Sequence, residues 1–72
     1  MEIDPEKAQR AFRHAYEKYP RFAAYGPRLV ARPLFKGHAF MLEYKAAPPQ
    51  DDPDAWEFQN AVVKSYRLLT GQ

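Results

Sequence analysis

The chain has 72 residues, 46% of them hydrophobic and 28% charged, with a formal net charge of +2 at pH 7. This composition is typical of a globular chain rather than a disordered one, and the length predicts one small domain, residues 1–72. The chain has no cysteine, which excludes disulfides and thiolate metal sites, and no apolar run approaches the ~20 residues that a membrane helix needs. Because the start, MEIDPEKA, lacks the layout of a signal peptide, we expect a cytoplasmic protein that does not enter a membrane.

The first element along the chain is a helix, predicted over residues 3–19. Asp4 is a favoured N-cap, and Pro5 suits the first helical position, where its missing N–H is no loss. Apolar residues then recur at three- and four-residue steps from Ala8 to Tyr19, which predicts one apolar stripe. Pro20 disfavours helical geometry at the residue before it, so the helix should end there.

A connector and a β-hairpin come next. Residues 22–25 form either a turn or a short third strand, and residues 28–35 and 38–45 have the pattern of paired strands about Lys36-Gly37. A two-residue loop would place Phe35 opposite His38 and Leu29 opposite Tyr44. A type I turn with Gly37 in the left-handed region is the alternative. In the two-residue register one face is almost wholly apolar and includes Phe35, while the other is mixed.

The last element is a second helix, which we expect to end near Leu69. Asp52-Pro53 repeats the capping pair of the first helix, and Asp54 with Glu57 offers a second capping option. The expected core stripe of this helix is Phe58, Val62, Tyr66 and Leu69. The fold class is therefore α+β, in the order helix–β-hairpin–helix, with both helices packed on one face of a small antiparallel sheet.

The basic residues are unevenly distributed. From Lys7 to Lys36 there are eight Lys and Arg residues and one acidic residue, Glu17. Such asymmetry favours an anionic partner, either nucleic acid or an acidic protein surface. The candidate contacts have no acidic residue among them in sequence: Arg21, Arg28, Arg32 and Lys36. The alternative is an ordinary solvated sheet face on which Arg32 pairs with Glu43.

Two further features indicate a protein partner. The second strand has no proline and an apolar centre, so its outer edge would be open to another strand unless something covers it. On the second helix, Trp56 and Val63 lie on nearly the opposite side from the core stripe. Trp56 either packs over Pro48 and Pro49 or contacts a partner, as tryptophan often does in interfaces. With Met41 at the centre of the second strand, these residues are the candidate protein contacts.

Nothing in the sequence indicates catalysis. The glycines are isolated, and the two hydroxyl residues of the serine type, Ser65 and Thr70, have no neighbouring histidine in sequence. No catalytic residue, metal site or cofactor is expected. The sequence therefore favours a small non-enzymatic interaction or regulatory protein that forms a homodimer or docks on a larger assembly. The alternatives are a nucleic-acid-binding module that uses residues 21–36 and, third, a small enzyme.

Overall fold

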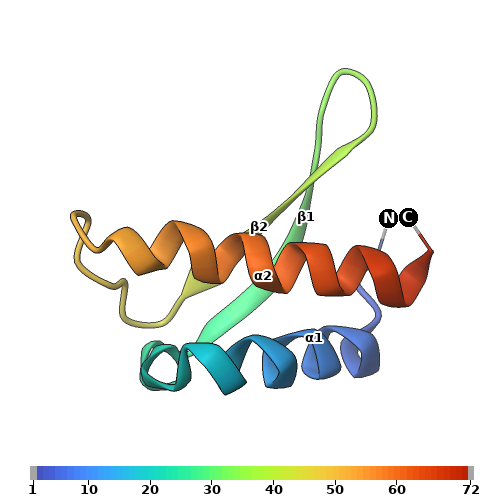
Figure 1. The fold of residues 1–72 in the computed structure, drawn as a ribbon. Coiled ribbons are helices and arrows are strands. Elements are labelled where there is room, and N and C mark those ends of the chain that lie inside the picture. Colours follow the sequence, from blue (N-terminus) through green and yellow to red (C-terminus); the bar gives the residue numbers. More distant parts are fainter. Residues whose placement is uncertain (1, 72) are drawn as a thin grey trace.

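The computed structural model describes residues 2–71 and confirms the order helix, hairpin, helix (Figure 1). The two helices lie side by side and antiparallel, and the hairpin crosses behind them. The helices pack on one face of the sheet, and the other face is uncovered by any described element. The elements in chain order are α1 (Pro5–Lys18), the 3-10 helix η1 (Pro20–Tyr25), β1 (Pro27–Pro33), β2 (His38–Tyr44) and α2 (Pro53–Thr70).

Both predicted helix starts are confirmed. The Asp4 carboxylate accepts hydrogen bonds from the backbone N–H groups of Glu6 and Lys7, at 3.0 and 3.2 Å. Asp52 accepts in the same way from the N–H of Asp54, at 3.0 Å. These bonds satisfy backbone donors that have no partner within the first turn of a helix.

The candidate third strand at residues 22–25 is wrong, because these residues belong to η1. Pro20 begins this helix, and the N–H of Phe22 donates to the carbonyl of Tyr19 at 3.2 Å. Gly26 closes it in the left-handed region, with φ of 61°. The tight local turns fold this segment back on itself, so its backbone is not extended for pairing with the sheet, which has two strands among the described residues.

The hairpin register also differs from the register that a two-residue loop predicts. Leu29 lies opposite Leu42, and Pro33 lies opposite His38, so each partner is displaced by two residues. The cause is the loop, which has four residues, 34–37, instead of two. A two-residue loop would need a positive φ at Lys36, whereas here the left-handed residue is Gly37, with φ of 89°. A shift of two residues keeps the side chains that remain within the strands on their predicted faces, since the side-chain period of a strand is two.

The new register changes the position of one predicted inner-face residue. Phe35 lies in the loop at the end of the hairpin and is 99% exposed, so its expected place on the apolar face is wrong.

The core contains residues from every element: Ala8, Ala11, Ala15, Phe22, Leu29, Phe40, Phe58, Val62 and Tyr66. Leu69 is 40% exposed and was wrongly expected in it, because it lines a shallow groove beside Arg10 and His14 of α1.

Candidate protein-docking surface

The hydrogen-bond pattern of the hairpin determines which backbone groups are left without a partner in the sheet. The Lys45 N–H donates to the Gly26 carbonyl at one end of the ladder, and the Leu34 N–H donates to the Gly37 carbonyl at the other. Hydrogen-bonded and non-bonded pairs alternate in an antiparallel ladder. The bonded pairs are therefore Arg28–Glu43, Val30–Met41 and Arg32–Ala39, and the residues between them direct their backbone groups outward.

The outer edge of β1 is a poor site for another strand. Its outward-facing backbone positions are Pro27, Leu29, Ala31 and Pro33. Two of these four positions are prolines, which have no N–H group to donate. β1 is an edge strand of the two-stranded sheet among the described residues, and its prolines protect the outer edge against pairing.

The outer edge of β2 has no such protection. Its outward-facing positions are His38, Phe40, Leu42 and Tyr44, each with both an N–H and a carbonyl group. No turn, loop or cap within residues 2–71 forms a backbone hydrogen bond to these groups. The edge is therefore a continuous row of donors and acceptors at the spacing that an added strand requires.

The α2 side chains beside this edge are partly apolar and exposed. The Arg67 guanidinium lies over the ring of Phe40, 5.0 Å from its centroid, which places this side of α2 next to β2. Val63 and Trp56 precede Arg67 by one and three helical turns, so they belong to the same stripe of α2. Trp56 is 67% exposed and Val63 is partly buried, so the indole is largely in solvent instead of packed against its own chain.

Met41 is at the centre of β2, on the uncovered face of the sheet. It lies opposite Val30 and is 37% exposed. The three residues predicted as protein contacts thus surround β2: Met41 is above the strand, and Trp56 and Val63 are on the helix packed beneath it. We call the β2 edge with Met41, Trp56 and Val63 the docking surface.

Three of the four predicted anionic-partner contacts form ion pairs within the chain. The Arg21 guanidinium contacts the Asp52 carboxylate at 2.6 and 3.0 Å and the Asp54 carboxylate at 3.0 Å. These contacts raise the pKa of Arg21 and lower that of Asp52, chiefly through the side-chain hydrogen bond between them. They connect η1 to the start of α2, so Arg21 has a structural role.

Glu43 is the acidic partner on the sheet. Arg28 contacts one of its carboxylate oxygens at 2.6 Å and Arg32 the other at 3.3 Å, so the predicted pair of Arg32 and Glu43 is confirmed. The hydrogen bond from Arg28 is the main cause that lowers the pKa of Glu43. Lys36, in the hairpin loop, forms no ion pair with any described residue.

Sequence spacing could not reveal these pairs. Arg21 and Asp52 are 31 residues apart, and Arg28 and Glu43 are 15 apart. The one signal in the sequence was the position of Glu43 on the mixed face of the predicted hairpin, which identified Arg32 as a partner. The contact of Arg21 with Asp52 depends on how η1 and the loop before α2 fold together.

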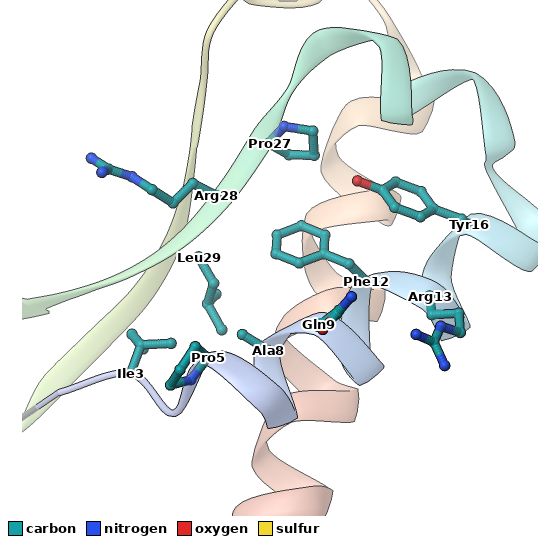
Figure 2. Close-up of a pocket in the computed structure, with 10 residues that line it drawn as sticks. All are labelled: Ile3, Pro5, Ala8, Gln9, Phe12, Arg13, Tyr16, Pro27, Arg28 and Leu29. Atoms are coloured by element: carbon teal, nitrogen blue, oxygen red, sulfur yellow. The ribbon is translucent and has the colours of Figure 1, made fainter.

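A groove of about 590 Å³ lies between α1 and β1, and none of the residues that line it belongs to the docking surface (Figure 2). Phe12, Leu29 and Pro27 form its apolar wall, while the charged ends of Arg13 and Arg28 extend away from its centre. Burial raises the pKa of Tyr16, so this phenol keeps its proton at neutral pH. The groove offers apolar contact without a set of converging polar groups.

No family model, curated sequence or solved structure gave a match to this chain. Within residues 2–71, no group of three or more acidic or histidine side chains is placed to hold a metal ion. None of the helices in this range is long and apolar enough to cross a lipid bilayer. The geometry of the chain is therefore the basis for a proposal about function.

Proposed function

We propose that this protein is a small binding module that self-associates by pairing β2 with β2 of a second copy. The observation that supports the proposal is the unprotected outer edge of β2 beside a β1 edge that carries two prolines. Natural proteins cover or interrupt such edges, so an edge that is open along a whole strand favours an added strand. A binding role of this kind fits a regulator or an accessory subunit.

The second copy is the favoured occupant because β2 is complementary to itself. An antiparallel pair centred on Met41 aligns all seven residues of each strand, His38–Tyr44. In that register Phe40 lies opposite Leu42 of the second copy, and Glu43 lies opposite Ala39, so no two like charges face each other. Every outward N–H and carbonyl of the strand gains a partner.

The dimer would have one four-stranded sheet with all helices on the same face. Trp56 and Val63 lie on the stripe of α2 that adjoins this edge, so the pairing would bring them towards their counterparts. The interface would then combine backbone hydrogen bonds with an apolar contact at an exposed tryptophan, which is a residue enriched at binding hot spots. The proposal assigns the chain a binding role and no reaction.

The test is the solution mass, measured by light scattering at 50 and 500 mM salt. We expect twice the 8.4 kDa of one chain at both salt concentrations, because the contacts are apolar and backbone contacts. Met41→Lys should give a monomer, since two lysines would meet at the two-fold axis. Val30→Lys places the same charge on the same face but on β1, and it should remain a dimer.

The fluorescence of Trp56 gives a second readout without any substitution. It is the single tryptophan of the chain and is largely exposed in one copy. On dilution, dissociation should shift its emission to longer wavelength over the range in which the mass falls. A wild-type chain that is a monomer at every concentration would refute the proposal, as would equal dissociation of the Met41→Lys and Val30→Lys variants.

A further inference from the structure

The end of the hairpin is an exposed apolar tip. Leu34 and Phe35 are 56% and 99% exposed, and the loop that holds them extends beyond both helices (Figure 1). The loop is closed by the hydrogen bond from the Leu34 N–H to the Gly37 carbonyl at 3.0 Å. The closure requires a φ of 89° at position 37, which is unfavourable for a residue with a side chain. Gly37 adopts it freely because it has none. Phe35 therefore sits at the end of a projecting hairpin, where it adds nothing to the core.

Basic residues follow the uncovered face of the hairpin from this tip to its base. They are Arg28, Arg32, Lys36 and Lys45, which we call the cationic hairpin surface. Glu43 is the acidic residue among them, so the surface has a net positive charge. Lys45 is at the base, where its side chain packs on Gly26, and Lys36 is at the tip.

The ion pairs of Glu43 do not prevent these arginines from binding another anion. The side chains of Arg28 and Arg32 are 74% and 60% exposed within their pairs with Glu43. Exposed ion pairs contribute little to stability, because water screens the charges. Phosphate oxygens can therefore replace the carboxylate at modest cost.

We propose that the hairpin binds duplex DNA, with the cationic hairpin surface on the phosphates and Phe35 inserted between base pairs from the minor groove. Apolar side chains act as such wedges in minor-groove binders, where neighbouring basic residues hold the backbone. A single strand would need several aromatic platforms in succession. The residues between the basic side chains on the uncovered face are Val30, Ala39 and Met41, none of which is aromatic. The arrangement therefore favours a duplex over a single strand.

The site differs from the docking surface in the residues that it uses. Lys36, Phe35 and Arg32 lie in the loop and on the open face, and none of their backbone groups belongs to the outer edge of β2. DNA binding therefore requires one hairpin and does not depend on self-association. Its failure would leave the mass measurement unchanged, and a monomeric chain could still bind DNA.

The experiment measures fluorescence anisotropy of a labelled 20-base-pair duplex, with the single strand of the same sequence as a comparison. The wild type should prefer the duplex, and log K should fall against log salt with a slope between about −2 and −4, for two to four phosphate contacts. Phe35→Ala should weaken binding on the order of tenfold, by loss of stacking. A duplex labelled at both ends should show a bend with the wild type and none with Phe35→Ala.

Two charge variants test the phosphate contacts in opposite directions. Lys36→Ala should weaken binding and reduce the salt slope by about 1, while Glu43→Gln should strengthen binding severalfold because it removes the competing carboxylate. Lys64→Ala is the matched control, since Lys64 is an exposed lysine that belongs to α2 and not to the hairpin, and it should bind as the wild type does.

Three results would overturn the proposal. One is equal weakening by Lys36→Ala and Lys64→Ala, which would mean unspecific attraction to a basic chain. Another is preferred binding to the single strand. The third is binding to phosphatidylserine vesicles, lost in Phe35→Ala, by a chain that does not bind the duplex.

Discussion

At the scale of single residues, Arg21 shows how one side chain can join two distant segments. It contacts both Asp52 and Asp54, and Asp52 also caps α2 with the same carboxylate. One carboxylate thus connects the start of α2 to the start of η1. The Arg21 guanidinium, which hydrogen-bonds to the carboxylate, is the main reason that the pKa of Asp52 is below its ordinary value, and burial acts in the opposite direction.

This lowered pKa predicts a loss of stability in acid. The ordinary pKa of Asp52 is 3.8, and its value in the folded chain is lower, so the unfolded chain takes up the proton first as the pH falls. The stabilisation is fully present above the ordinary pKa and is lost as the pH falls through the folded-state pKa. We expect this part of the stability to be lost as the pH falls below about 4, so that the melting temperature falls less steeply there in Arg21→Ala than in the wild type.

The control for this prediction is Arg13→Ala, which removes an exposed arginine that forms no ion pair with the described residues. It should keep the pH dependence of the wild type. If Arg21→Ala and the wild type lose the same number of degrees, the ion pair of Arg21 does not contribute to acid sensitivity.

At the scale of elements, the start of α1 is held from two directions. The Asp4 side chain caps α1, and the backbone N–H of Asp4 donates to the hydroxyl of Tyr66 at 3.0 Å. Tyr66 is on α2, 62 residues away in sequence, and is 2% exposed. This bond connects the beginning of one helix to the last turns of the other, where the two lie side by side (Figure 1).

Tyr66→Phe tests that connection. It removes the hydroxyl and leaves the Asp4 N–H without its acceptor, which should lower the free energy of unfolding by about 1–2 kcal/mol. The measurement is urea denaturation followed by circular dichroism. Tyr25→Phe makes the same chemical change at a partly buried ring whose hydroxyl has no protein hydrogen bond among the described residues, and it should cost less. Equal costs would mean that the bond to Asp4 does not stabilise the fold.

At the scale of the whole molecule, one ring is at the centre of the core. Phe58 is fully buried and stacks on Phe22, with ring centroids 4.7 Å apart and planes at 9°. Three further aromatic rings, from α1 and its end, lie within 6.3 Å of it: Phe12, Tyr16 and Tyr19. Since a chain of this length buries only about 60% of its extended surface, a single central ring matters more than in a larger domain.

Phe58→Ala should therefore be severely destabilising. Loss of a buried phenylalanine costs about 3–5 kcal/mol, a large part of the 5–15 kcal/mol that stabilises a typical domain. Phe35→Ala is the same substitution at a 99% exposed position and should change stability by less than about 0.5 kcal/mol. Thermal melting of both variants checks the prediction, and a comparable loss in Phe35→Ala would mean that the hairpin tip contributes to the core.

The sequence by itself determined what depends on local chemistry. The Asp-Pro pairs fixed both helix starts, Pro20 ended α1, and the period of two divided the hairpin into an apolar and a mixed face. Only the tertiary structure decided the loop length that set the register, the 3-10 turns at residues 20–25, and the position of Phe35 in solvent. It also decided which acidic residues pair with Arg21 and Arg28, because those contacts join segments 15 to 33 residues apart. Caps and periodicity act within a few residues, whereas ion pairs and exposure depend on how whole elements pack.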